Sequence, residues 1–218
     1  MIRKIWTCWF QGEDDPGMPE LNRICKKRWI EFNDQWDYTV ITNDNIAEYI
    51  PEYCAMMHSY GHEFHRSYTN KADVLRLFLL QKYGGVWADT SVYPMMPLDD
   101  FYDEIVNETG FFTYRFFPRS IKKKLGDREA ISWLFITREP DNYLISRTKD
   151  KLVKRYLAKD AYKYFSLSEA MCELYDSDEK AKHIIDNMVQ ISEQIPHSAL
   201  KSWKLREPSY MYKRPSLV

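Results

Sequence analysis

The residues best suited to chemistry lie in one short stretch, residues 74–94, with the sequence VLRLFLLQKYGGVWADTSVYP. Asp89 follows a strand-like run and Ser91 comes two residues later, so an extended chain would direct both side chains to the same side. A carboxylate and a hydroxyl placed in this way suit a hard divalent cation that also takes oxygens from water and substrate phosphates. The alternative interpretation is a turn in which Asp89 caps its own backbone.

Two charged residues, Asp73 and Arg76, are three positions apart in a run that reads as a helix. Because positions three apart share one helix face, the two side chains can interact. On a solvated face such an ion pair would contribute less than about 1 kcal/mol. The neighbouring residues 74–75 and 77–80 are all apolar, which is typical of a buried helix, and a buried charge must be paired or used. The sequence leaves both interpretations open.

Another group of candidate residues lies in the stretch QIPHSALKSWK, residues 194–204. His197 is a possible metal ligand, and Lys204 can act as a point charge for phosphate. A loop that carries both side chains could close over a metal-bound diphosphate. The alternative is that His197 has a purely structural role.

Hydrophobic periodicity and turn residues predict the elements that must position these side chains. Strands are expected at residues 2–10, 38–42, 110–117 and 131–138, and residues 86–94 should form a strand that leads into a turn. Helices are expected at residues 20–33, 46–50, 52–60, 70–83, 141–157, 166–175 and 178–194. The apolar face expected for the first helix consists of Leu21, Ile24, Cys25, Trp29 and Phe32. For the 70–83 helix, Asn70 is the expected N-cap and Gly84 the left-handed residue past the end.

The order strand, helix, strand, helices, strand in the first half predicts an α/β sheet with helices on its faces. Ligands of open α/β sheets bind beyond the carboxyl ends of the strands. Gln11, Asn43 and Asp89 each lie just after a predicted strand or at its end, so these polar side chains indicate a binding cleft.

The net charge of −1 argues against a nucleic-acid-binding protein, which would need a basic surface. Residues 119–128 are nevertheless rich in arginine and lysine. This stretch reads either as a solvated loop or as a lip for an anionic acceptor or a membrane surface.

The four cysteines show no CxxC or metal-ligand spacing, so we expect buried free thiols. The N-terminus lacks the apolar core of a signal peptide, and no apolar run approaches the ~20 residues of a membrane-spanning helix. We therefore expect a soluble protein of the reducing cytoplasm. Phosphate loops, nucleophile elbows and HExxH motifs are absent from the sequence.

The segment KADVLRLFLLQKYGGVWADTSVYPMMPL, residues 71–98, resembles the core motif of the capsular polysaccharide synthesis family. This family is related to initiating α-1,6-mannosyltransferases and, more distantly, to glucosylating bacterial toxins. The stretch KIWTCWFQG resembles the family's first strand, and IPHSALKSWK resembles its C-terminal ending. The matching motif residues are Ala72-Asp73-Val74-Leu75-Arg76, Tyr83-Gly84-Gly85, Trp87 and Asp89-Thr90-Ser91.

The resemblance implies a GT-A-like nucleotide-sugar-binding fold, with a mixed sheet flanked by helices and a helical C-terminal part. We expect one domain over residues 1–218, with a nucleotide-sugar-binding half at 1–98 and an acceptor-side half at 99–218. The implied reaction moves a sugar, with retention, from a UDP- or GDP-sugar to a glycan or lipid-linked acceptor. It would serve bacterial capsular or surface polysaccharide biosynthesis, with peripheral contact at the inner face of the cell membrane.

The resemblance also implies roles for single residues. Asp89 would hold Mn²⁺ or Mg²⁺ on the donor diphosphate, and Asp73 with Arg76 would orient the donor sugar. Trp9 would stack on the base, and Trp87 would pack near the nucleotide. Gln11, Asn43 and Lys204 complete the expected donor-binding set.

Ser91 departs from the family pattern, because it stands where an Asp-x-Asp motif has its second acid. The substitution removes one negative charge from the expected metal site, and His197 could complete the ligand set. A degenerate family member that binds a sugar or glycan without catalysis is therefore the alternative function. Trp133 and Asp127 are the expected acceptor-side residues.

Overall fold

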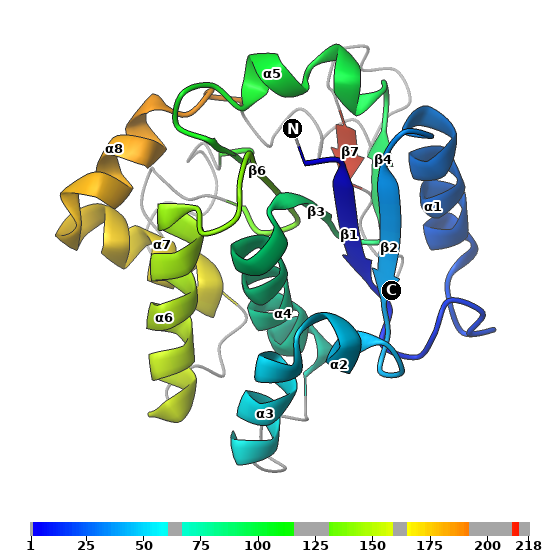
Figure 1. Cartoon of the computed structure of the whole chain (residues 1–218), viewed down its shortest axis with the longest axis horizontal. Coiled ribbons are helices and arrows are strands. Elements are labelled where there is room, and N and C mark those ends of the chain that lie inside the picture. The colour runs from blue at the N-terminus through cyan, green and yellow to red at the C-terminus, as the bar shows by residue number, and fades with distance from the viewer. Residues whose placement is uncertain (1, 61–66, 116–130, 159–164, 192–210, 214–218) are drawn as a thin grey trace.

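The computed structural model describes residues 2–60, 67–115, 131–158, 165–191 and 211–213 (Figure 1). Within these ranges the main sheet has five strands in the order β2-β1-β3-β6-β5. They are β1 (Lys4–Cys8), β2 (Asp37–Ile41), β3 (Gly85–Ala88), β5 (Phe111–Phe112) and β6 (Leu134–Thr137). Strand β1 pairs in parallel with β2 and β3, whereas β6 is antiparallel to β3 and β5. The sheet is therefore mixed, as predicted.

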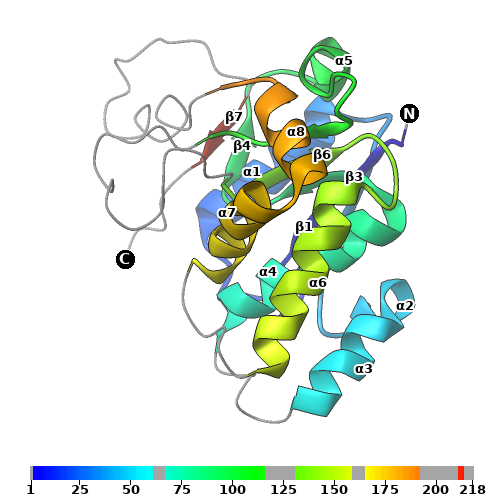
Figure 2. The ribbon, with the colours of Figure 1, turned by 90° about the vertical axis from the view of Figure 1, so that its left-hand side faces the viewer.

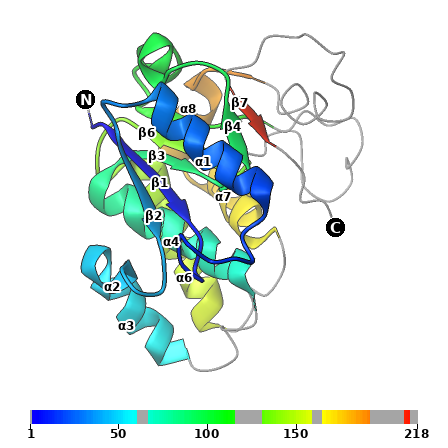
Figure 3. The ribbon, with the colours of Figure 1, turned by 90° about the vertical axis from the view of Figure 1, so that its right-hand side faces the viewer.

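Helices cover both faces of this sheet. In the two side views α1 lies on one face, while α4 and α6 lie on the other (Figures 2 and 3). The helices are α1 (Glu20–Phe32), α2 (Ile46–Tyr49), α3 (Pro51–Tyr60), α4 (Tyr68–Tyr83), α5 (Tyr102–Ile105), α6 (Tyr143–Leu157), α7 (Ser166–Ser177), α8 (Glu179–Asn187) and the 3₁₀ helix η2 (Leu98–Asp100).

The core is divided in two by the sheet, because successive strand residues point to opposite faces. Trp6, Trp87 and Phe135 belong to the apolar cluster that includes side chains of α4, α6, α7 and α8. Ile5 and Val86 belong to a second cluster, which includes side chains of α1 and α5. Apolar burial on both faces fixes the position of β1 and β3 at the centre of the molecule.

Helix α1 follows Pro19 as predicted, but its buried face differs from the expected one. The buried residues are Asn22, Cys25 and Trp29, whereas Ile24 is 44% exposed. The Trp29 indole donates a hydrogen bond of 2.8 Å to the carbonyl of Val92, and this bond helps to fix the rotation of the helix. A polar residue, Asn22, therefore lies on the core-facing stripe.

Helix α4 is buried along most of its length. Its N-cap is Ser67 rather than the expected Asn70, because the Ser67 hydroxyl accepts a hydrogen bond from the backbone N–H of Asn70 (3.4 Å). The structured helix therefore begins before residue 70. Asn45 is the N-cap residue of α2, and its side chain accepts a hydrogen bond from the backbone N–H of Thr42 rather than from the helix.

A glycine pair joins α4 to β3. Gly84 ends the helix with φ of 67°, as predicted, and its N–H donates to the carbonyl of Leu80 (2.9 Å). Gly85 has φ of 91°, and a Cβ atom there would lie 2.5 Å from the backbone oxygen of Lys4. Because only glycine tolerates both conditions, this pair lets β3 start against β1 directly after the helix.

After Ala88 the chain turns and forms β4 (Val92–Pro94), which pairs antiparallel with β7 (Met211–Lys213). The register places Val92 opposite Lys213. The sequence pattern does not predict the strand at residues 211–213, since three residues are too few to show a periodicity. Several elements are shorter than predicted: for example, β1 ends at Cys8, β5 ends at Phe112, and α8 ends at Asn187.

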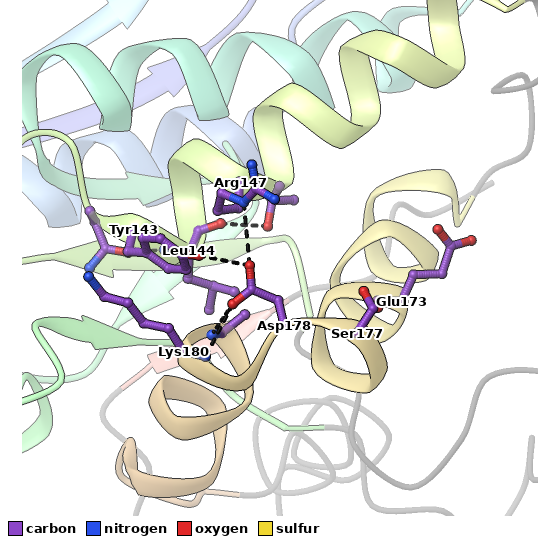
Figure 4. A network of polar contacts seen from close by, with 10 residues as sticks. Tyr143, Leu144, Arg147, Glu173, Ser177, Asp178 and Lys180 are labelled. Carbon is purple, nitrogen blue, oxygen red and sulfur yellow. Dashed lines mark hydrogen bonds and ion pairs between the residues drawn. The ribbon is translucent and has the colours of Figure 1, made fainter.

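Asp178 joins the C-terminal helices (Figure 4). Its Oδ1 accepts hydrogen bonds from the N–H groups of Lys180 (3.1 Å) and Ala181 (3.0 Å), and so caps α8. Its Oδ2 accepts hydrogen bonds from the Tyr143 hydroxyl (2.8 Å) and from Nε of Arg147 (3.4 Å), both on α6. One side chain therefore ties α8 to the helix that packs against α4.

All four cysteines are free, as expected, but only Cys25 is fully buried. In the ranges that the structure describes, no helix combines the length and the apolar character needed to cross a bilayer.

Candidate functional site

Arg76 of helix α4 lies at the centre of the candidate site. Its Nη2 atom is 3.0 Å from Oδ1 of Asp73 and 3.5 Å from Oδ1 of Asp89. Its Nε donates to the carbonyl of Ala72 (3.2 Å), and its Nη1 donates to the carbonyl of Ser132. Groups from α4, from the end of β3 and from the segment before β6 thus hold one guanidinium.

The pair Asp73–Arg76 is buried, because each side chain is only 4% exposed. The interpretation as a solvated surface pair is therefore wrong. The guanidinium carbon also lies 5.0 Å from the centre of the Trp87 ring, a cation–π contact that further stabilises the buried charge. Removing any one partner would leave an uncompensated charge in the interior.

Burial raises the pKa of Asp73 to about 6. The Arg76 charge opposes this rise and the Asp89 charge adds to it. Burial has the largest effect on this pKa, because the carboxylate loses its hydration almost completely and one ion pair does not replace that hydration. Asp73 is therefore mostly ionised at neutral pH and takes up a proton when the pH falls below about 6.

Asp89 starts the turn between β3 and β4. Its N–H donates to the carbonyl of Trp133 (2.9 Å), and its carbonyl accepts a hydrogen bond from Val92 (2.9 Å). Its Oδ1 accepts a hydrogen bond from the Trp87 indole (3.0 Å). With a side chain that is 29% exposed, Asp89 is partly accessible from outside, unlike Asp73 and Arg76. Asp89 is a turn residue, and its geometry also leaves it accessible to a ligand.

The candidate metal ligands are the Asp89 carboxylate and the Ser91 hydroxyl, and both residues are partly exposed. Among the residues that the structure describes, no cluster of three His, Cys, Asp or Glu side chains could hold a metal ion. Two hard oxygen ligands fit Mg²⁺ or Mn²⁺ when substrate phosphates and water supply the rest of the shell. The chain therefore fits a cation shared with a diphosphate better than a cation in a closed protein cage.

Three further donor-binding candidates, Trp9, Gln11 and Asn43, lie at the same edge of the sheet. Trp9 follows β1, and its indole donates a hydrogen bond of 2.8 Å to Oδ2 of Asp15. Gln11 and Asn43 are exposed, and the N–H of Asn43 donates to the carbonyl of Phe10 (3.0 Å). Because β2, β1 and β3 are adjacent and parallel, the segments after their carboxyl ends lie side by side.

An aromatic and cationic cluster at this edge was not predicted from the sequence. Tyr68 is 55% exposed and stacks on Phe10, with ring centres 5.6 Å apart. The Lys71 ammonium lies 5.3 Å from the centre of the Tyr68 ring. The three-residue spacing of Tyr68 and Lys71 on a helix is the signal that could have found the pair.

Cys8 ends β1 close to the same charges. Burial raises the pKa of its thiol far above the ordinary value, while the positive charge of Arg76 opposes the rise. The thiol therefore stays protonated, which makes Cys8 unsuitable as a nucleophile.

Several predicted site residues lie outside the described residues: His197, Lys204, Asp127 and the basic stretch 119–128. Trp133, an expected acceptor residue, is buried and stacks on Tyr114 with ring centres 5.0 Å apart. Its carbonyl supports Asp89, as described above. An acceptor role for Trp133 stays a prediction.

Comparison with known proteins bears on this arrangement. An initiation-specific α-1,6-mannosyltransferase of Saccharomyces cerevisiae (strain ATCC 204508 / S288c) is 28% identical over 100 residues, which is 44% of this chain and 21% of that protein. The match thus spans about one fifth of the yeast protein's length.

Two solved structures resemble the fold. PaToxG glycosyltransferase has a TM-score of 0.56 and 14% identity, over 84% of this chain and 73% of that chain. The catalytic domain of alpha-toxin from Clostridium novyi has a TM-score of 0.45 and 11% identity, over 84% and 67%. The second likeness is too loose to support an inference, whereas the first confirms the expected GT-A-like α/β fold.

The family comparison covers nearly the whole chain. The family described as "Capsular polysaccharide synthesis protein" matches residues 1–207, which include Asp73, Arg76 and Asp89. The resemblance inferred from residues 71–98 is thereby confirmed. This chain belongs to the capsular polysaccharide synthesis protein family.

Proposed function

We propose that this protein is a glycosyltransferase that moves a sugar from a nucleotide-sugar donor to a glycan or lipid-linked acceptor. The observation that carries the proposal is the buried Arg76, which bridges Asp73 and the partly exposed Asp89. The family and the sugar-transfer enzymes named above support the same activity. The reaction would serve bacterial capsular or surface polysaccharide synthesis in the cytoplasm, with peripheral membrane contact where the acceptor is lipid-linked.

The donor, a UDP- or GDP-sugar, would lie along the carboxyl edge of β2, β1 and β3. Adjacent strands are about 4.8 Å apart, so the Asn43 and Asp89 ends of this edge are separated by roughly two strand spacings. A nucleotide with its diphosphate near Asp89 would reach Trp9, Gln11 and Asn43 with its base. This spacing supports the proposal that Trp9, Gln11 and Asn43 contribute to donor binding.

Cleavage of the bond between the sugar and the diphosphate leaves negative charge on the leaving group. A bound Mn²⁺ or Mg²⁺ would neutralise part of this charge. Asp89 and Ser91 would hold the cation, and Lys204 and His197 would add contacts at the phosphates and the metal.

Asp73 and Arg76 would orient the donor sugar. In the part of the chain that the structure describes, Arg76 is the one ion-pair partner of Asp73. A hydroxyl group of the sugar would donate a hydrogen bond to the second oxygen of Asp73 and help to offset its burial. Because several groups fix Arg76, its charge would need little reorganisation during sugar transfer. We propose retention of configuration, as the family resemblance implies.

A catalytically degenerate protein that binds a sugar or glycan is the second candidate. Ser91 in place of an acid favours it, together with the lack of a three-residue metal cluster among the described residues. Under this alternative the cleft would bind a ligand without breaking a bond.

The test is a panel of UDP- and GDP-sugars, each incubated with the protein and with Mn²⁺, Mg²⁺ or EDTA. We expect release of UDP or GDP from at least one donor, faster with a divalent cation. Donor binding by calorimetry without release would support the binding-only alternative. Neither binding nor release with any donor would contradict both candidates.

A further inference from the structure

Asn22 of helix α1 makes a long-range contact with the candidate metal site. The residue is buried, and its side-chain Nδ2 donates a hydrogen bond of 3.0 Å to Oγ1 of Thr90. Thr90 lies between Asp89 and Ser91, the two candidate metal ligands. The bond therefore links helix α1, which packs against β4, to the middle of the turn that carries both ligands.

Among the residues that the structure describes, backbone hydrogen bonds hold the two ends of this turn. The N–H of Asp89 donates to the carbonyl of Trp133, and the N–H of Val92 donates to the carbonyl of Asp89. Val92 is also held through its carbonyl by the indole of Trp29. These bonds leave the position of residues 90 and 91 to other contacts, and the Asn22 amide supplies one at Thr90.

A buried amide is costly unless its polar atoms find partners. Asn33, just after α1, shows the ordinary solution: it bonds the carbonyl of Trp29 (3.0 Å) and the N–H of Leu98 (2.7 Å) within the scaffold. The side-chain amide of Asn22 instead donates its hydrogen bond to the Thr90 hydroxyl, which belongs to the candidate site. This difference between two buried asparagines is what points to a role for Asn22.

We propose that Asn22 is a positioning residue, which sets the separation of the Asp89 carboxylate and the Ser91 hydroxyl by holding Thr90. Asn22 itself touches neither donor nor cation. The inference rests on the proposed function, because it concerns ligands proposed for the donor-bound cation. Removing a residue that hydrogen-bonds to a metal ligand typically lowers metal affinity about 10- to 100-fold. The loss of a tether at Thr90, next to both ligands, should therefore have a measurable effect on metal affinity.

The first measurement is the Mn²⁺ concentration that gives half-maximal binding of UDP or GDP, determined by calorimetry. We expect Asn22→Ala and Thr90→Val to raise this concentration by about 10-fold. Thr90→Ser keeps the hydroxyl and should stay near wild type. Asn22→Ala and Thr90→Val remove the same hydrogen bond. The double variant should therefore need no more Mn²⁺ than either single variant.

Asn33→Ala is the matched control. It also removes a buried asparagine beside α1, so it should lower stability without changing the Mn²⁺ requirement. An equal rise in Asn33→Ala would overturn the proposal, since the effect would then reflect general destabilisation. If Asn22→Ala does not fold, Thr90→Val carries the same test, and an unchanged Mn²⁺ requirement in Thr90→Val would overturn the proposal.

Amide hydrogen exchange of residues 89–92, without ligands, separates this inference from the proposed function. We expect faster exchange at Val92 in Asn22→Ala and Thr90→Val, but not in Asn33→Ala. Unchanged exchange in both site variants would overturn the tether even if donor transfer is confirmed. If the wild type binds neither nucleotide with Mn²⁺, the proposed function fails, and the exchange rates alone decide whether Asn22 holds the turn.

Discussion

Arg76 and Asp89 form an ion pair that joins the middle of helix α4 to the end of strand β3, with Nη2 and Oδ1 3.5 Å apart. The cation is buried and the carboxylate is partly exposed, so the pair spans the boundary between the core and the surface. The same nitrogen also contacts Asp73. A change at any of these three residues should therefore affect both stability and the candidate site.

Arg76→Lys should strongly reduce donor cleavage and lower stability. A lysine offers a single point charge, which cannot bond two carboxylates and two carbonyls in a planar arrangement. We expect a loss of about 1–3 kcal/mol in unfolding free energy, because the lysine keeps the charge but leaves buried acceptors of the guanidinium without a hydrogen bond. Urea denaturation and nucleoside diphosphate release measure the two effects. Adding Asp73→Asn should lower stability further, because the lysine charge would lose a buried partner, and should restore no activity. Recovery of activity would contradict the proposed role.

Asp89→Asn should abolish metal-dependent donor cleavage while the fold stays intact. The amide oxygen can still accept the Trp87 indole hydrogen bond, but the negative charge proposed for metal binding is lost. Asp99→Asn is a matched control, because Asp99 accepts a similar bond from the Trp36 indole (3.1 Å). Circular dichroism and initial rates at several Mn²⁺ concentrations give the comparison. Unchanged turnover would mean that Asp89 serves only the turn.

Stability and activity should respond to pH in opposite directions. Between its ordinary pKa of 3.8 and the folded value of about 6, Asp73 binds more protons in the folded state than in the unfolded chain. Its contribution to the unfolding free energy therefore falls as the pH rises through this window, by on the order of 1–3 kcal/mol. Donor cleavage should rise over the same window, because the ionised carboxylate accepts the sugar hydroxyl.

Urea denaturation and initial rates between pH 4 and 8 test this pair of trends. Asp73→Asn removes the titrating group and is the control. If the variant shows the same slope in stability as the wild type, Asp73 is not the group responsible.

Gly85→Ala should be severely destabilising. The new Cβ would lie 2.5 Å from the backbone oxygen of Lys4, and the backbone there has φ of 91°. Gly12→Ala separates the two causes, since Gly12 has φ of 109° but no atom within 4 Å of the added Cβ. We expect a cost of about 1–3 kcal/mol for Gly12→Ala from backbone strain, and a larger cost for Gly85→Ala. Equal thermal midpoints of the two variants would rule out the steric contribution.

Local signals made much of the site predictable. The apolar run before Gly84 predicts a buried helix, the glycine pair predicts its end, and the polar residue after the next strand predicts the edge where ligands bind. The family resemblance adds roles to Asp73, Arg76 and Asp89. These features depend on neighbours within about one helical turn, which is the range over which sequence patterns carry information.

Contacts between distant segments were not predictable from such patterns. The Asn22–Thr90 bond joins residues 68 positions apart, and no periodicity indicates which buried polar residue reaches which turn. The rotation of α1 was also missed, because apolar residues lie on several sides of this helix and the Trp29 bond to Val92 helps to select its buried face. Pairing of β4 with β7 depends on three residues at each strand, too few for an alternating pattern.

The pairing of Val92 with Lys213 has a consequence for the order in which the protein can be assembled. The two strands are separated by about 120 residues. During synthesis on the ribosome, β4 therefore cannot pair with β7 until nearly all of this sequence has been made. Closing so long a loop is slow compared with forming α4 or the β1–β2 pair. The segment that directly follows the Asp89 turn would thus be among the last to gain its final neighbour, and a nascent chain would complete the candidate site only after most of its core had formed.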